Sequence, residues 1–182
     1  MINKNFTLTL DNFLSEKDCK DIIEFFKDKT QPPENNYLNY LQADIEQSPF
    51  MFLISTKILS AIDEYKKLYP ESHMTSSYWG FTNMRFKHFK PGKNFDNWHS
   101  EHSFLYSYRM LSIMIYLSDH NCGTEFYNGD IIKSKVGRLT MFPAYFTHTH
   151  RGQICPDNKD RYLLTGYFNF VRQGENETKT DE

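Results

Sequence analysis

The feature that most constrains the fold is a series of strand-like segments between residues 78 and 170, separated by turn signals. Segment 111–117 is almost wholly apolar, which is typical of a strand buried on both faces. Asn128-Gly129 is a strong hairpin signal, because both residues tolerate the positive φ angles of a type I′ turn. Such successive strands favour a sandwich, a barrel or a jelly roll. We expect about seven or eight of them, including 78–90, 109–117, 124–127, 130–135, 138–142 and 161–170.

Two helices are expected before these strands. Ser15, followed by acidic residues in the first turn, has the pattern of a helix N-cap, and apolar residues continue one face to about Lys29. In segment 48–70, apolar residues again recur at helical spacing, and Pro70 ends the pattern. A short Thr-rich strand at 6–10 comes first. We expect both helices to pack on the outside of one sheet.

Length and composition set limits on the class of protein. A chain of 182 residues fits one domain, and we expect it to span 1–172, with a metal-binding core at about 78–170 and a flexible polar tail at 173–182. The 21 basic and 23 acidic residues give a formal charge of −2, which offers no basis for binding nucleic acid. No segment approaches the ~20 apolar residues of a membrane span, and the first ten residues lack the apolar core of a signal peptide. We therefore expect a cytoplasmic protein without a membrane partner, and the pattern favours no particular oligomeric state.

The cysteines are few and scattered. Cys19, Cys122 and Cys155 are odd in number and have no Cys-x-x-Cys spacing. This pattern argues against a disulfide framework and against a structural zinc cluster. We expect all three to be buried or unreactive thiols.

The candidate site begins with a His-x-Glu pair, His99 and Glu101. Residues two apart on an extended backbone point to the same side, so this imidazole and this carboxylate can converge. A second imidazole from a distant strand would complete two His and one carboxylate, the ligand set of non-heme Fe(II) oxygenases. His148 and His150 are both eligible, and they too lie two apart. The His-x-Glu pair alone is weak support, since such a pair often arises by chance.

Several short motifs follow one another between residues 84 and 170, about half of the chain: Phe89-Lys90-Pro91-Gly92, Trp98-His99-Ser100-Glu101, Arg109 to Asp119, Gly123-Thr124-Glu125-Phe126, Gly137 to Pro143, Thr147 to Gly152, and Arg161 to Gly166. In this order they resemble the iron(II)/2-oxoglutarate-dependent dioxygenase superfamily, particularly small phage and bacterial members of its prolyl 4-hydroxylase-like branch. The resemblance implies a mainly β fold with a double-stranded β-helix (jelly roll) core. It also implies Fe(II), 2-oxoglutarate and O2, with ascorbate as an accessory reductant. The implied reaction is hydroxylation of an unactivated C–H bond in a peptide, protein or small molecule, and a prolyl or other peptide side chain is the suggested target.

The resemblance also assigns roles to residues. His99, Glu101 and the distal His correspond to the metal ligands and catalytic centre. In this family a Lys or Arg follows the distal His and binds the far carboxylate of 2-oxoglutarate; Arg161 follows His150 by 161 − 150 = 11 residues and His148 by 161 − 148 = 13. The spacing favours His150 without excluding His148. A guanidinium suits this role because it can grip a carboxylate with two parallel hydrogen bonds. Tyr116 falls where similar hydroxylases have a Tyr that donates to the same carboxylate.

The sequence departs from the family at some positions, and other functions remain open. Glu101 stands where most relatives have Asp, and Phe89 where many have a co-substrate-binding Tyr. Arg109 lies where some peptide hydroxylases contact their substrate, but it also fits a solvated Arg at the start of a strand. The same ligands could hold zinc or manganese in a cupin-like hydrolase or lyase that has no use for 2-oxoglutarate. A non-catalytic barrel acting as a binding module is the other alternative.

Overall fold

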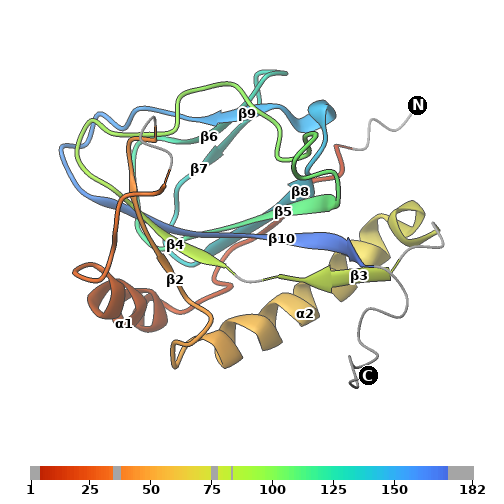
Figure 1. Cartoon of the computed structure of the whole chain (residues 1–182), viewed down its shortest axis with the longest axis horizontal. Coiled ribbons are helices and arrows are strands. Elements are labelled where there is room, and N and C mark those ends of the chain that lie inside the picture. Colours follow the sequence, from red (N-terminus) through yellow and green to blue (C-terminus); the bar gives the residue numbers. More distant parts are fainter. Residues whose placement is uncertain (1–4, 35–37, 75–77, 83, 172–182) are drawn as a thin grey trace, which may run out of the picture.

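The structure, a computed structural model, describes residues 5–34, 38–74, 78–82 and 84–171 (Figure 1). The strands in this part of the chain are β1 Leu8–Leu10, β2 Leu41–Asp44, β3 Tyr78–Phe81, β4 Arg85–Phe89, β5 Arg109–Tyr116, β6 Gly123–Phe126, β7 Ile131–Lys133, β8 Arg138–Pro143, β9 His150–Gly152 and β10 Arg161–Val171. The α-helices are α1 Glu16–Phe26 and α2 Met51–Leu68, and the 3-10 turns are η1 Pro70–His73 and η2 Phe146–His148. The prediction of a mainly β protein with two helices is confirmed. The predicted tail at 173–182 lies outside the described residues.

The strands form two antiparallel sheets. The larger has seven strands in the order β1-β8-β5-β10-β4-β2, with β3 also paired to β10, and the smaller has the order β7-β6-β9. Figure 1 shows the smaller sheet above one face of the larger sheet, while both helices lie below the opposite face. The two sheets therefore face each other, and the helices cover the outer face of the larger sheet. Among the described helices, none is long and apolar enough to cross a membrane.

Strand β10 is the centre of the larger sheet. On one side it pairs with β5, and on the other it pairs first with β4 and then with β3. The sequence predicted a single strand at 78–90. The structure divides that segment, because β4 follows the Arg161–Thr165 part of β10 whereas β3 follows the Phe168–Val171 part. Strand β2, paired with β4, was not predicted, because its alternating sequence Leu-Gln-Ala-Asp is only four residues long and lies in a segment of mixed composition.

The helices form where local signals are strong. The Ser15 hydroxyl accepts a hydrogen bond from the Asp18 backbone N–H at 3.0 Å, and the Asp18 carboxylate accepts one from the Ser15 N–H at 3.4 Å. This capping box satisfies donors that an isolated helix start would leave unpaired. Both helices bury one apolar face against the larger sheet, in a core that includes Cys19, Ile22, Phe26, Ile54, Ile58, Ile62 and Tyr65.

Gly137 is required both by a close backbone approach and by its backbone conformation. Gly137 has φ +72°, and a Cβ there would lie 2.2 Å from the Leu14 carbonyl oxygen. The Gly137 carbonyl also accepts a hydrogen bond from the Leu14 N–H at 3.2 Å, so the segment before α1 lies directly against the turn before β8. The connection fixes where the first helix begins relative to the sheet.

We expect Gly137→Ala to lower the free energy of unfolding by about 3 kcal/mol, because it combines a left-handed conformation with a steric overlap. Urea denaturation followed by circular dichroism measures the change. Gly92→Ala is the matched control, since Gly92 also has φ +72° but nothing within 4 Å of an added Cβ. It should cost only about 1 kcal/mol. Equal losses in the two variants would show that the approach to Leu14 is unimportant.

Candidate metal centre

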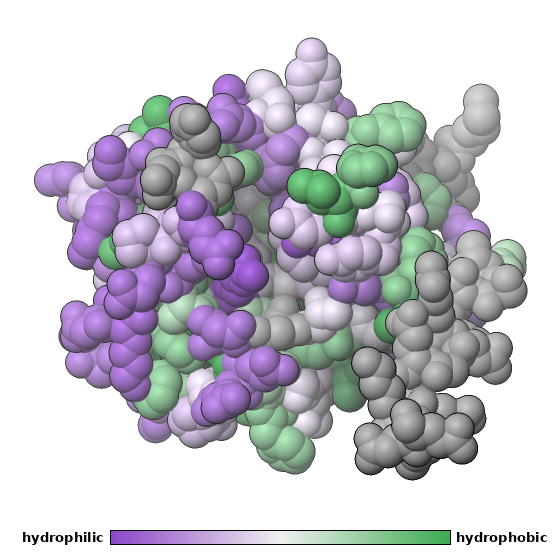
Figure 2. All heavy atoms as spheres, in the orientation of Figure 1, coloured by the Kyte–Doolittle hydropathy of each residue, from purple (hydrophilic) through white to green (hydrophobic). Residues whose placement is uncertain are grey.

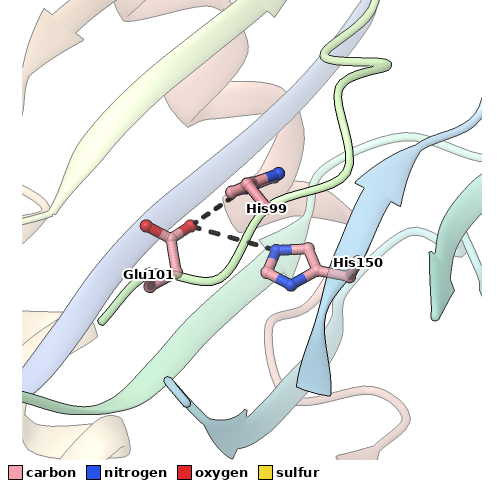
Figure 3. Close-up of side chains that lie close together, drawn as sticks. All are labelled: His99, Glu101 and His150. Atoms are coloured by element: carbon pink, nitrogen blue, oxygen red, sulfur yellow. Dashed lines mark ion pairs between the residues drawn. The ribbon is translucent and has the colours of Figure 1, made fainter. Parts of the chain in front are cut away.

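The two imidazoles of the candidate centre are carried by paired backbone positions. His99 and His150 form an isolated antiparallel bridge, in which each N–H donates to the other's carbonyl oxygen, at 3.0 and 2.9 Å. Residues directly opposite each other in an antiparallel pair project their side chains to the same face. The rings accordingly lie side by side, with centroids 4.4 Å apart (Figure 3). The segment around His99, for which an extended backbone was expected, and the short strand β9 thus meet at the site.

Glu101 completes the group. Its Oε1 lies 3.5 Å from Nε2 of His99 and 3.9 Å from Nε2 of His150 (Figure 3). One ligand atom from each of the three residues lies within 4.8 Å of the others. Donors around an ion with bonds of about 2.1 Å stand about 3 Å apart. Small side-chain rotations would therefore bring all three atoms onto one ion.

The hydrogen bonds of the rings fix which nitrogen faces the centre. Nδ1 of His99 lies 2.9 Å from the Asn97 carbonyl oxygen, and Nδ1 of His150 lies 2.9 Å from that of His148. A carbonyl can only accept, so each Nδ1 carries a proton, and in the neutral form of either ring Nε2 presents a lone pair toward the centre. Nε2 of His150 is buried without a hydrogen-bond partner in the described part of the chain. A buried imidazole nitrogen without a hydrogen-bond partner, next to a carboxylate, is the arrangement expected of metal ligands without their ion.

The charges at the site suit a metal cation. Burial alone would raise the pKa of the Glu101 carboxyl, but the contact with His99 and the charge of Lys87 outweigh it and lower the pKa from 4.5 to about 2. Burial, together with the charge of His99, lowers the pKa of His150 from 6.5 to about 4. At neutral pH the carboxylate is therefore ionised and the His150 imidazole neutral, which are the forms that bind metal.

His148, the alternative distal ligand, is used elsewhere. It ends the 3-10 turn η2, and its Nε2 donates to the Asn5 carbonyl oxygen at 2.7 Å. Its Nδ1 lies 3.0 Å from the Thr147 hydroxyl. The structure therefore brings His150, and not His148, to His99 and Glu101.

The three residues line a cavity of about 760 Å³ that also contains Arg161 and Tyr116. The Arg161 guanidinium lies over the Phe89 ring, 4.6 Å from its centroid, and its Nη1 donates to Cys122 Sγ at 3.4 Å. Only 4% of the residue is exposed, and its Nε has no hydrogen-bond partner in the described chain. Burial lowers the pKa of Arg161. In the part of the chain that the structure describes, no carboxylate is paired with this guanidinium, and a buried cation without a counter-charge is costly.

Tyr116 lies on the neighbouring strand β5, opposite Leu163 of β10. Its hydroxyl is 2.7 Å from the Thr124 hydroxyl, and burial raises its pKa, so it stays protonated at neutral pH. Gly152, two residues after His150, lines the cavity, and its lack of a side chain leaves space next to Arg161. A Cβ there would lie 3.5 Å from Arg161 Nη2 and 3.3 Å from the Phe95 carbonyl oxygen.

Cys122 and Cys155 are joined by a disulfide, so the prediction of idle thiols is wrong for these two residues. The bond ties the start of β6 to the loop before β10, next to the Arg161 guanidinium. Spacing gave no sign of it, because the two residues are far apart in sequence and meet only through the sheet pairing. Cys19 is the free cysteine of the described chain; burial raises the pKa of its thiol to about 11, so it is the unreactive thiol expected.

The sequence also failed to indicate two partners of the Glu101 carboxylate. Its Oε2 accepts a hydrogen bond from the Tyr167 hydroxyl at 2.8 Å and one from Arg109 Nη1 at 3.0 Å. Burial and the charge of Glu101 raise the pKa of Tyr167 well above 10. The Arg109 side chain is only 16% exposed, so the alternative of a solvated Arg is wrong. Tyr167 lies within the predicted strand 161–170 and nothing in the sequence marks it, so only the tertiary structure shows its partner.

No family model matches the sequence, and no curated protein matches it significantly. Solved structures do match. The viral collagen prolyl hydroxylase from Paramecium Bursaria Chlorella virus-1, in its 2-oxoglutarate complex, matches with a TM-score of 0.69 and 18% identity, over 93% of this chain and 98% of that one. A prolyl-4-hydroxylase from Pseudomonas putida matches with a TM-score of 0.67 and 17% identity, over 94% and 95%. A prolyl hydroxylase from Trichoplax adhaerens, bound to a hypoxia inducible factor peptide, matches with a TM-score of 0.71 and 13% identity, over 92% and 85%. The chain therefore has the fold of prolyl hydroxylases over nearly its whole length, in agreement with the resemblance of its motifs.

Proposed function

We propose that this chain is an Fe(II)- and 2-oxoglutarate-dependent dioxygenase of the prolyl 4-hydroxylase type, with residues 1–172 forming one domain around a double-stranded β-helix. The observation that carries the proposal is the pairing of two sites in one cavity. Two imidazoles and a carboxylate converge on one point, and the same cavity contains a buried guanidinium that has no acidic partner among the described residues. A simple metal hydrolase would need the first site but not the second.

His99, Glu101 and His150 would hold the iron. Two neutral nitrogens and one anion on one side of the ion leave the opposite positions open for exogenous ligands. Bound iron and 2-oxoglutarate supply the oxidising power: one O2 is consumed, 2-oxoglutarate becomes succinate and CO2, and a substrate C–H becomes C–OH. The backbone carbonyls that accept from both Nδ1 atoms orient the imidazoles for this task.

Arg161 and Tyr116 would bind the far carboxylate of 2-oxoglutarate. The guanidinium supplies the charge, and the Tyr116 hydroxyl supplies a neutral donor held in place by Thr124. Phe89, which stands where many relatives have a Tyr, contributes a ring under the guanidinium instead of a hydrogen bond to the co-substrate.

A peptide side chain, and a prolyl residue in particular, is the substrate class that we propose. The Trichoplax neighbour is bound to a peptide, and the other two neighbours are also prolyl hydroxylases. On the face shown in Figure 2, hydrophilic residues predominate on the left and a group of hydrophobic residues lies at the upper right. Phe104 and Leu105, just after Glu101 in sequence, are 97% and 74% exposed, and Tyr106 and Tyr108 line the cavity. Exposed apolar residues next to an active cavity suit a partner that brings apolar side chains.

The proposal is tested by succinate release from 2-oxoglutarate in the presence of Fe(II) and air, with ascorbate as reductant. We expect slow turnover without added substrate, and faster turnover with a prolyl peptide that the enzyme accepts. Binding of 2-oxoglutarate to the Mn(II)-loaded protein, measured by isothermal titration calorimetry, is the readout that needs no substrate. A protein that binds Mn(II) but neither binds nor consumes 2-oxoglutarate would be a metal hydrolase or a binding module instead.

A further inference from the structure

The two oxygens of the Glu101 carboxylate have different surroundings. Oε1 faces the imidazoles of His99 and His150, at 3.5 and 3.9 Å. Oε2 faces away from them and accepts the hydrogen bonds from Arg109 and Tyr167. Both donors come from the larger sheet, Arg109 at the start of β5 and Tyr167 within β10, whereas the ligands come from the segment around His99 and from β9.

Arg109 is itself packed between aromatic rings. Its guanidinium carbon lies 3.8 Å from the centroid of the Tyr106 ring and 3.7 Å from that of Tyr167, and the side chain is 16% exposed. Arg109 is also paired with Asn169, two residues after Tyr167 on β10. The two donors therefore lie on adjacent strands, and the guanidinium of Arg109 packs on the ring of Tyr167.

We propose that Arg109 and Tyr167 are positioning residues that make Glu101 a one-oxygen metal ligand. The inference rests on the metal site of the proposed function but on no step of its chemistry. Glu101 has one more rotatable bond than the Asp that most relatives carry, and a free carboxylate can turn to give a cation both of its oxygens. Two fixed donors on Oε2 occupy that oxygen, direct Oε1 to the metal and leave the remaining coordination positions open.

This role separates Arg109 from the substrate contact that the family resemblance suggested. A guanidinium committed to an ionised carboxylate at 3.0 Å and stacked between two rings has little freedom to follow a substrate. The hydrogen bonds from Arg109 and Tyr167 also explain how a Glu fits a site in which most relatives have Asp. The longer side chain of Glu101 can contact the two donors on the sheet and the metal ion between the imidazoles at the same time.

The test measures Mn(II) affinity by the electron paramagnetic resonance signal of the free ion, and the visible absorption of the Co(II)-loaded protein. We expect Tyr167→Phe to weaken Mn(II) binding about 10-fold or more, as for other partners of metal ligands. It should also change the Co(II) spectrum, because the carboxylate changes its binding mode. Tyr106→Phe is the matched control: its ring also stacks on Arg109, but no hydrogen bond joins its hydroxyl to Glu101 among the described contacts. It should keep both the affinity and the spectrum.

A second pair of variants tests the reach of the side chain. Glu101→Asp should weaken Mn(II) binding strongly in the wild-type background, because the shorter side chain cannot reach the metal and also accept the hydrogen bonds from Arg109 and Tyr167. In the Tyr167→Phe background the further loss should be several-fold smaller. Two results would overturn the inference but leave the metal site intact. One is that the losses of Mn(II) affinity from Tyr167→Phe and Glu101→Asp are additive. The other is that Tyr167→Phe binds Mn(II) as tightly as Tyr106→Phe does. Wild-type protein without Mn(II) binding would overturn both the inference and the proposed function.

Discussion

Replacing His150 by Ala will remove 2-oxoglutarate turnover and lower the affinity for Mn(II) by more than about 100-fold. Loss of an outer partner alone already costs 10- to 100-fold in metal affinity, and His150 would be a direct ligand. Its Nε2 is the buried, unpartnered atom that faces the Glu101 carboxylate. Mn(II) titration measures the affinity, and succinate release under air measures the turnover.

The matched control is His148→Ala. This residue lies two positions earlier in the sequence and was the other candidate, but its ring hydrogen-bonds Asn5 and Thr147. We expect nearly wild-type metal affinity and turnover, with a loss of stability of about 1 kcal/mol from the hydrogen bonds. Because His150 packs against Phe126 and Phe142, thermal melts of both variants are needed to show that they fold. Metal loss in His148→Ala, with retention in His150→Ala, would contradict the site.

Arg161→Met will weaken the binding of 2-oxoglutarate by about 100-fold, since removal of one partner from a buried charge pair typically costs several kcal/mol. Metal affinity should stay unchanged. The protein without ligand should be as stable as the wild type or more stable, because a buried guanidinium that no described carboxylate neutralises opposes folding until an anion binds. Calorimetric titration of the Mn(II)-loaded protein with 2-oxoglutarate gives the affinity, and melting temperatures give the stability.

Arg151→Met serves as its control. Arg151 lies next to His150 on β9, but its guanidinium is already paired with Glu125 at 3.0 Å and stacks on Trp98 at 4.4 Å. We expect 2-oxoglutarate binding close to that of the wild type and a small loss of stability. If Arg161→Met bound 2-oxoglutarate normally, another cation in the cavity, such as Lys87, would have to be the anchor.

Much of the fold could be predicted because its signals are local. The capping box at Ser15 and the helical spacing in α2 depend on residues within one or two turns, and both helices are present. The apolar run that predicted β5 and the Asn128-Gly129 turn between β6 and β7 are equally local. Strands β2 and β9 were missed because they are only four and three residues long, too short for a reliable pattern, and pairing with β4 and β6 makes them strands.

The sequence by itself determined the residue types of the centre: a His-x-Glu pair, a distant His and an Arg at a suitable spacing. Only the tertiary structure decided which distal His reaches that pair. The bridge between His99 and His150 turns both rings to one face, whereas the 3-10 turn η2 directs His148 toward Asn5. It also decided that Tyr167 and Arg109 hold the second oxygen of Glu101 and that Cys122 bonds Cys155. Such contacts depend on strand register between segments far apart in the chain, and register is set by the packing of the whole sheet.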